Sequence, residues 1–199
     1  MWLVVGLGNP GRQYAGNRHN AGFMVIDELL RRSGADTPRL RMGGELAEGS
    51  LGGSKVVFCK PMEFMNTSGF PVSRAAGFWK IPPAQTLVVH DDMDIEFGRL
   101  RVAEGGGSGG HNGLRSIVSG FGSETFCRLR FGVGRPPTSW QGADYVLADF
   151  SPEERKVLPN LIEEAADAAE VVVRDGVVAA MNKFNRKKKS QKSETGGAS

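Results

Sequence analysis

Short runs of apolar or alternating residues, several rich in valine, are separated along this chain by segments whose apolar residues recur at helical spacing. The runs span residues 3–5, 55–60, 86–90, 99–102 and 127–133. Runs of this length, bounded by glycine or polar residues, are typical of strands buried in a sheet. The periodic segments predict helices at residues 23–34, 72–79 and 112–119. Strands interleaved with helices predict an α/β sandwich around a sheet.

The C-terminal part opens with a strong helix start. Ser151, Pro152 and Glu154 supply an N-cap, a first-turn proline and a capping-box glutamate. We expect this helix to run to about Arg174, because Gly follows shortly after it. Pro159 lies inside the helix and predicts a kink or a delayed start of the regular part.

One domain and a tail account for the whole sequence. A last short helix is expected over residues 177–184, and no internal repeat or linker interrupts the pattern. We therefore expect a single domain over residues 1–185, folded as a three-layer sandwich with a mixed, mostly parallel central sheet flanked by helices. Residues 186–199 are polar and basic, a composition that predicts disorder.

The composition is typical of a soluble cytoplasmic protein. Hydrophobic residues make up 40% of the 199 and charged residues 24%, and no apolar run reaches the roughly 20 residues that cross a bilayer. The first residues lack the basic segment and the cleavage site of a secretory signal. Cys59 and Cys127 lie in separate strand-like runs, which favours buried free thiols in a reducing compartment over a disulfide.

The basic charge is concentrated in the tail. Residues 186–199 hold five lysines and arginines against one glutamate, a net charge of +4, whereas the whole chain carries +3, so the remainder is at −1. A local excess persists between Arg99 and Arg135, where six arginines face two glutamates. That stretch can contact phosphate, although a solvated arginine face explains it equally well.

The three histidines lie in polar segments that follow predicted strands or precede predicted helices. His19 belongs to GLGNPGRQYAGNRHN, His90 opens HDDMD, and His111 lies in GGGSGGHNG. A fourth polar segment, FMNTSG, precedes the second helix. Loops at strand ends converge at one edge of the sheet in α/β folds, so these segments predict a single site.

Three generic motifs in these segments lack the context that they require. G-x-G-x-x-G follows the first strand, but no helix begins there and no acidic residue ends a second strand. G-x-S-x-G around Ser108 needs a later histidine, and none follows His111. The histidines also lack close zinc-ligand spacing. We expect no cofactor and no metal, with a metal-dependent hydrolase kept as an alternative.

The remaining set is a histidine, a carboxylate and several asparagines. An imidazole is suited to take a proton from water at neutral pH. A buried aspartate that accepts its other N–H fixes the tautomer and stabilises the imidazolium. Asparagine amides bind a peptide backbone or a developing oxyanion without adding charge. This set predicts metal-free chemistry centred on His19.

In their order and spacing, the motifs GLGNPG, RHN, FMN-SG, HDD-D and GGHNGL resemble those of the bacterial peptidyl-tRNA hydrolase family. The resemblance extends from Leu3 to about Phe184. It implies that residues 1–185 form a catalytic domain that hydrolyses the ester between a peptide and the 3′ ribose of tRNA. It also implies a cytoplasmic monomer whose partner is peptidyl-tRNA, without cofactor or membrane.

The resemblance assigns roles to the catalytic set. His19 is the general base that activates water, and Asp91 orients it. Asn9 is similar to the asparagine that senses whether the amino group of the substrate is blocked, and we hypothesise that its carbonyl oxygen accepts the substrate amide N–H. Asn66 and Asn112 resemble residues that bind the peptide backbone near the ester.

The resemblance also implies a substrate cleft and a tRNA-binding side. Tyr14 and Phe64 match positions that line the cleft, and Arg101 and Arg130 match basic positions that bind tRNA. Ala103 stands where the family often has a second basic residue, so the individual phosphate contacts stay open. The alternative from another class is a non-catalytic RNA-binding relative that acts with a protein partner, against which the retained catalytic set argues.

Two histidines have less defined roles. His111 is either a structural partner within the glycine-rich segment or an auxiliary substrate contact, and we favour the structural role. We expect His90 to order its own loop.

Overall fold

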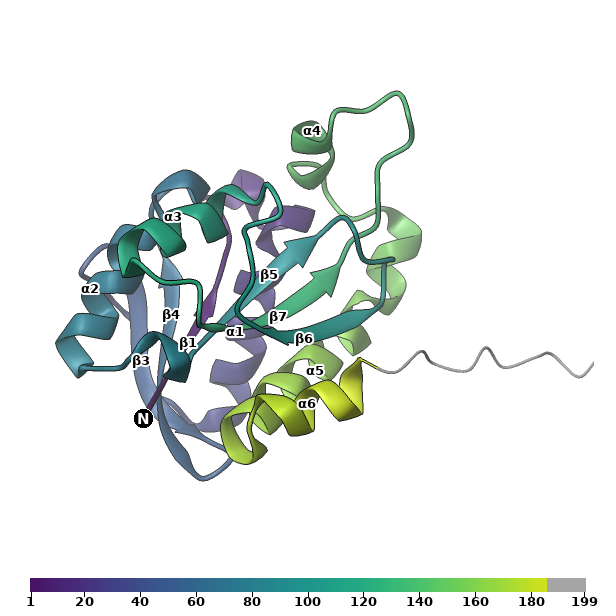
Figure 1. Cartoon of the computed structure of the whole chain (residues 1–199). Helices are drawn as coiled ribbons and strands as arrows, with labels where there is room; N and C mark the ends of the chain where they lie inside the picture. Colours follow the sequence, from purple (N-terminus) through teal and green to yellow (C-terminus); the bar gives the residue numbers. More distant parts are fainter. Residues whose placement is uncertain (186–199) are drawn as a thin grey trace, which may run out of the picture.

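The computed structural model describes residues 1–185, through which runs one sheet of seven strands (Figure 1). Its order is β2-β3-β4-β1-β5-β7-β6. The pairs β4–β1, β1–β5 and β5–β7 are parallel, whereas β2–β3, β3–β4 and β6–β7 are antiparallel. The strands are β1 (Trp2–Gly6), β2 (Arg39–Arg41), β3 (Gly44–Leu51), β4 (Ser54–Pro61), β5 (Thr86–Asp92), β6 (Leu100–Glu104) and β7 (Cys127–Gly132).

Helices cover both faces of this sheet, as Figure 1 shows. One face carries α1 (Ala21–Ser33), α5 (Pro152–Asp175) and α6 (Val177–Phe184). The other carries α2 (Gly69–Trp79) and α3 (Asn112–Phe121). The connections hold α4 (Gly142–Val146) and the 3-10 helices η1 (Arg12–Tyr14), η2 (Arg18–Asn20), η3 (Met65–Thr67) and η4 (Pro83–Gln85). The predicted three-layer sandwich around a mixed sheet is confirmed.

The central strand β1 contributes to both hydrophobic cores. Val4 belongs to the core beneath α1 and α5, whereas Leu3 and Val5 belong to the core beneath α2, and all three are fully buried. Successive side chains of a strand point to opposite faces, so a strand covered on both sides needs a continuous apolar run. Each such side chain stabilises the fold by about 1.5–3 kcal/mol when it leaves water.

A close backbone approach sets helix α1 against the strand ends. A Cβ added to Gly22 would lie 2.4 Å from both the Leu7 nitrogen and the Val89 oxygen, so a larger residue cannot occupy this position without displacing backbone. Helix α1 therefore begins directly beside the C-terminal ends of β1 and β5. His19, in η2 just before the helix, is placed at the same edge.

Helix α5 begins as the sequence predicts. The Ser151 hydroxyl accepts a bond from the Glu154 N–H at 3.2 Å, and the Glu154 carboxylate accepts one from the Ser151 N–H at 2.7 Å. This capping box satisfies two helix-start donors. The helix runs unbroken from Pro152 through Pro159, so its regular part is not delayed. The helix ends at Asp175, one residue beyond the expected end.

Among the strands and α-helices of residues 1–185, three have no predicted counterpart: β2, β3 and α4. Strand β2 is exposed along its whole length, and β3 contains exposed or half-exposed residues between buried ones. The two strands form a hairpin through Met42 and Gly43, both at positive φ. They therefore lack the apolar run that identifies the buried strands.

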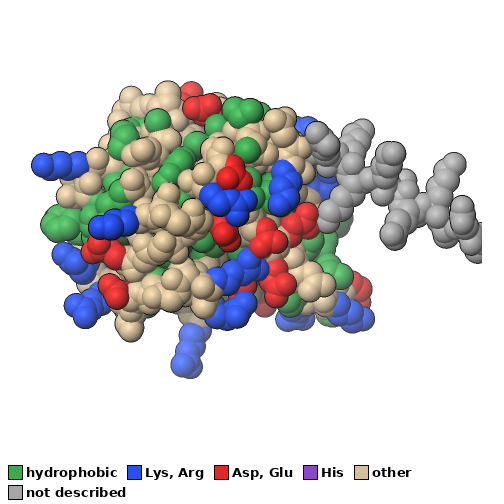
Figure 2. Space-filling model, turned by 90° about the horizontal axis from the view of Figure 1, so that it is seen from below, with side chains coloured by type: hydrophobic (Ala, Val, Ile, Leu, Met, Phe, Trp, Pro, Cys, Tyr) green, Lys and Arg blue, Asp and Glu red, His purple; other side chains and the backbone are tan. Residues whose placement is uncertain are grey.

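The remaining surface and core properties agree with the composition. Cys59 and Cys127 are buried free thiols, as expected, and burial raises the pKa of Cys59 to about 12. No helix in the described part of the chain combines the length and apolar character of a membrane span. Figure 2 shows basic and acidic side chains intermixed on the face seen from below, with no histidine visible there. The predicted disorder of residues 186–199 lies outside the described residues.

Candidate active site

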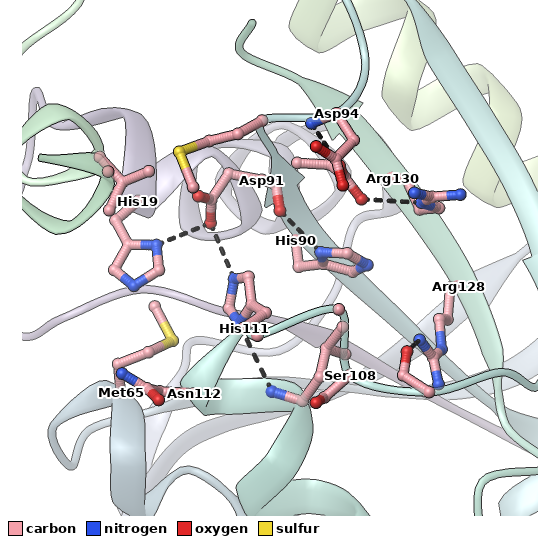
Figure 3. A pocket seen from close by; sticks show the side chains of 18 of the residues that line it. His19, Met65, His90, Asp91, Asp94, Ser108, His111, Asn112, Arg128 and Arg130 are labelled. Carbon is pink, nitrogen blue, oxygen red and sulfur yellow. Dashed lines mark hydrogen bonds and ion pairs between the residues drawn. The ribbon is translucent and has the colours of Figure 1, made fainter. Parts of the chain in front are cut away.

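The polar segments identified in the sequence meet around one cavity of about 700 Å³ at the C-terminal ends of β1 and β5 (Figure 3). The loop after β1, η2, the end of β5 and the glycine-rich segment before α3 all contribute to its lining. Residues of α4 and the arginines of β7 complete the wall. The predicted convergence of strand-end loops therefore occurs here.

Asp91 lies at the centre of the cluster and is 2% exposed. Its Oδ1 accepts hydrogen bonds from His19 Nδ1 at 2.8 Å and from His111 Nε2 at 3.0 Å. Burial opposes ionisation of this carboxyl, but the charges and hydrogen bonds of the two imidazoles hold its pKa well below the ordinary value. Asp91 is therefore a carboxylate at any pH at which the protein works.

The hydrogen bonds assign the tautomers of the two rings on either side of Asp91. His111 is the N-cap of α3, and its Nδ1 accepts from the Gly113 and Leu114 N–H groups at 3.2 and 3.4 Å. Its proton therefore resides on Nε2, which donates to Asp91. His19 donates from Nδ1, so its Nε2 carries the lone pair, and the ring lines the cavity. This is the arrangement of a general base.

Arg18 anchors the backbone on which His19 is placed. Its guanidinium donates to the Glu154 carboxylate at 2.7 Å and to the Asp149 carbonyl at 2.8 Å. It also lies 4.2 Å from the centroid of the Tyr145 ring. Arg18 is 6% exposed, and its Nε has no hydrogen-bond partner among residues 1–185. Its ion pair with Glu154 and its carbonyl contacts nevertheless tie η2 to α5 and to the segment after α4.

Asn9 is held by the same polar framework, but its orientation differs from the prediction. Its Oδ1 accepts the Met65 N–H at 2.9 Å. Its backbone N–H and carbonyl are both paired with the Asn20 amide at 2.9 Å. Among the described residues nothing pairs with Asn9 Nδ2. The network therefore presents a donor to the cavity, whereas we had hypothesised an acceptor for the substrate N–H.

The other predicted substrate contacts divide into two groups. Phe64, Asn66 and Asn112 line the cavity with exposed side chains. Tyr14, in η1, is not among the lining residues.

The predicted tRNA-binding arginines also differ in their positions. Arg130 lines the cavity and its Nε donates to Asp92 at 2.8 Å. Arg101 of β6 is the cross-strand neighbour of Arg130 on β7. Its side chain is exposed, and it is not among the residues that line the cavity. Ala103, also in the lining, pairs with Arg128.

His90 is buried behind the cluster. Its Nδ1 donates to the Asp91 carbonyl at 2.7 Å, and its ring packs edge-on against His111 with centroids 5.1 Å apart. Burial, and then the proximity of His111, hold the pKa of His90 well below the ordinary value. The ring is thus neutral and orders the end of β5, in agreement with the role expected for it.

The same three side chains could be considered as metal ligands. The ligand atoms of His19, Asp91 and His111 lie within 4.8 Å of one another. However, Asp91 Oδ1 accepts a hydrogen bond from each ring, and the nitrogen lone pair of His111, on Nδ1, is used by backbone N–H groups. A metal needs deprotonated ring nitrogens aimed at a common point. The hydrogen-bond pattern therefore favours proton transfer.

Two features of the site have no counterpart in the sequence reasoning. His111 bonds directly to Asp91, and Arg128 is a buried arginine in the cavity wall. The motif around His111 suggested a functional segment, but no local pattern specifies that a residue 20 positions away shares the carboxylate. In the sequence, Arg128 is one of six clustered arginines, and nothing in the cluster distinguishes it from the others.

Comparisons with known proteins identify the family to which the chain is similar. The family model described as peptidyl-tRNA hydrolase matches residues 3–193. The peptidyl-tRNA hydrolases of Frankia alni and Chloroflexus aurantiacus are 50% and 48% identical to the chain, across 92% and 93% of it and 93% and 99% of their own lengths. The crystal structure of peptidyl-tRNA hydrolase from Acinetobacter baumannii superposes with a TM-score of 0.87 at 36% identity, covering 94% of this chain and 96% of that one.

Proposed function

Because the chain belongs to the peptidyl-tRNA hydrolase family and therefore hydrolyses the ester that joins a peptide to tRNA, we propose that His19 is the base that activates water. The observation that carries this proposal is the 2.8 Å bond from His19 Nδ1 to the buried Asp91 carboxylate. This bond leaves Nε2 as the proton acceptor on the cavity side.

The reaction then proceeds in two proton transfers. Water gives a proton to His19 Nε2 as its oxygen attacks the ester carbonyl carbon, and Asp91 stabilises the imidazolium that forms. The tetrahedral intermediate collapses with cleavage of the carbon–oxygen bond to the ribose. The imidazolium returns its proton to the leaving ribose oxygen, so the products are a peptide acid and free tRNA.

Amide groups around His19 supply the positioning that base catalysis alone does not. General base catalysis is worth roughly 10²–10⁴-fold. Asn9 offers Nδ2, while Asn66 and Asn112 offer complete amides at the cavity surface. These groups are suited to bind the peptide backbone and the oxyanion. Phe64 contributes an exposed aromatic surface for the substrate.

The cellular setting follows from the substrate. We place the enzyme in the cytoplasm as a monomer, with Arg101 and Arg130 on the side that binds tRNA. Their charges face the phosphate backbone, so binding should weaken with salt. Tyr14 lies outside the cavity lining and contributes only if the substrate extends beyond it.

A turnover assay with labelled N-acetyl-aminoacyl-tRNA and unblocked aminoacyl-tRNA tests this function. We expect hydrolysis of the blocked substrate in strong preference to the unblocked one. An Asn9→Asp variant replaces the free amide donor by an acceptor and should reduce that preference. Absence of turnover at micromolar enzyme, with tRNA binding retained, would instead indicate a non-catalytic RNA-binding relative.

A further inference from the structure

Two arginines of β7, Arg128 and Arg130, lie on the face of the sheet that lines the cavity. Leu129 and Phe131 of β7 point into the core beneath α5, so Arg128 and Arg130 point to the opposite face. Both line the cavity, and so does Ala103, the cross-strand neighbour of Arg128 on β6. The floor of the cavity away from His19 is therefore a cationic strip of sheet.

Arg128 differs from its neighbour in how it is partnered. It is 5% exposed, and its Nη1 donates to the Gly107 carbonyl at 2.6 Å. Its Nε and Nη2 are buried and have no hydrogen-bond partner within residues 1–185. Arg130, by contrast, is neutralised by the Asp92 carboxylate at 2.8 Å. The described residues supply Arg128 with no carboxylate at ion-pair distance.

The free atoms of Arg128 form one edge of the guanidinium. Nε and Nη2 carry the two parallel N–H groups that bind a phosphate or carboxylate side-on. A buried charge with unsatisfied donors is costly unless a ligand completes it. Burial also lowers the pKa of Arg128, the direction expected when the charged form is poorly compensated, although an arginine stays protonated.

We propose that Arg128 binds a phosphodiester of the 3′-terminal segment of the substrate RNA, an inference that rests on the proposed function. Arg128 is three residues along β7 from Phe131, the cross-strand neighbour of Asp91. The backbone positions of Arg128 and Asp91 are therefore separated by roughly 10 Å along the strand direction, and both residues line the cavity. The ester is on the terminal ribose, and the nearest phosphates lie one and two ribose units away. Their anionic oxygens suit the free edge of Arg128.

Because Nε and Nη2 of Arg128 are buried, the segment Gly105–Gly110 must shift for a phosphate to reach them. An added Cβ would meet no atom within 4 Å at Gly106, Gly107, Gly109 or Gly110. No packing of side chains therefore fixes the segment over Arg128. The segment can therefore move to admit a phosphate at Nε and Nη2 without disturbing a hydrophobic core.

Substrates with and without phosphate test the proposal. The N-acetyl-aminoacyl ester of adenosine has no phosphodiester, and the same ester of cytidylyl-cytidylyl-adenosine has two. We expect Arg128→Gln to lower kcat/KM for the trinucleotide ester by about ten- to a hundredfold, the range of one bidentate contact, and to change the adenosine ester less than twofold. Arg128→Lys keeps the charge but not the fork and should be intermediate. Arg174→Gln, on α5, is the matched control and should change neither.

A second measurement uses the unaltered protein. Replacing the terminal linkage of the trinucleotide ester by a neutral methylphosphonate should lower kcat/KM by at least about tenfold. Equal losses of Arg128→Gln on both esters, or no loss on either, would overturn the proposal, as would indifference of the unaltered enzyme to the methylphosphonate at both linkages.

Direct titration separates this proposal from the catalytic one. Fluorescently labelled cytidylyl-cytidylyl-adenosine should bind the unaltered protein and lose about tenfold or more in affinity with Arg128→Gln. If that loss is seen while no ester is hydrolysed, the phosphate site stands and the proposed function fails. If esters are hydrolysed and binding does not depend on Arg128, the phosphate site fails and the function stands.

Discussion

Two buried charges lie in the same cavity and are treated in opposite ways. Asp91 accepts bonds from two imidazoles, and the ring of His111 is held in place by backbone N–H groups as well. Arg128 is almost as buried but donates to a single carbonyl among the residues described. The protein completes the group that must hold a fixed geometry for proton transfer. It leaves incomplete the group whose partner we expect to arrive with the substrate.

Removing the base should have the largest effect on activity. We expect His19→Ala to lower kcat by at least about 10²-fold, because no other described side chain presents a lone pair held by Asp91. Affinity for tRNA, measured by fluorescence anisotropy, should stay within twofold, since the cationic floor is untouched. Near-full activity of this variant would remove His19 from the mechanism.

Neutralising the Asp91 carboxylate tests the buried charge that has hydrogen-bond partners within the protein. Asp91→Asn keeps the side-chain shape but no longer stabilises the imidazolium, and an amide donor there favours the wrong tautomer of His19. We expect kcat to fall by about 10²-fold. Asp94→Asn, which alters an exposed carboxylate paired with Arg135, is the control and should change kcat less than twofold. Similar losses in both variants would count against a special role for Asp91.

The stability of two arginine variants should separate a buried charge with a carboxylate partner from one without. Arg18→Gln leaves the Glu154 carboxylate without its partner, and we expect the free energy of unfolding to fall by about 3–5 kcal/mol. Arg128→Gln loses one hydrogen bond and relieves an uncompensated charge, so its cost should be less than about 1 kcal/mol. Urea denaturation measures both, and equal costs would contradict the comparison.

The free energy of unfolding should depend on pH because His90 and Asp91 are buried groups with lowered pKa values. The lowered pKa values of His90 and Asp91 mean that the unfolded chain binds more protons than the folded one in acid. Stability should be full above the ordinary histidine pKa of about 6.5 and decline as the pH falls, at up to about 1.4 kcal/mol per pH unit for His90. Asp91 adds to this below about pH 4.

A His90→Asn variant isolates the histidine contribution. Between pH 7 and 5 the unfolding free energy of the variant, measured in urea, should vary less steeply than that of the unaltered protein. Parallel curves would show that His90 is not the group that titrates.

The smallest effect is expected from a chelator. If His19 and His111 donate N–H groups to Asp91 and hold no metal, prolonged dialysis against EDTA should change kcat/KM less than twofold. Loss of activity that zinc restores would show that His19, Asp91 and His111 hold a metal instead, and would reassign the tautomers.

The fold was predictable where buried strands appear in the sequence as runs of apolar residues. Strands β1, β4 and β5 carry apolar runs because helices cover both of their faces. Strand β7 alternates apolar residues with arginines, because one face packs on the core and the other lines the cavity. Strands β2 and β3 are specified by pairing and by a hairpin with residues at positive φ. These features leave little hydrophobic signal, because an exposed strand buries few side chains.

The site was predictable as a set of segments but not as a set of bonds. Polar clusters at strand ends indicated that His19 and Asp91 would meet. The direction of the Asn9 amide depends on a backbone N–H from Met65, which no local pattern reveals. The burial of Arg128 likewise depends on the register between β6 and β7, a long-range property of the sheet.

Neighbouring aspartates at the end of β5 have separate tasks: Asp91 bonds to the imidazoles and Asp92 to Arg130. Because side chains alternate along a strand, a slip of one residue would exchange the two carboxylates. Insertions in the glycine-rich segment leave this choice unaltered, whereas a single insertion in β5 reverses it. The spacing within β5 therefore decides which carboxylate meets the imidazoles.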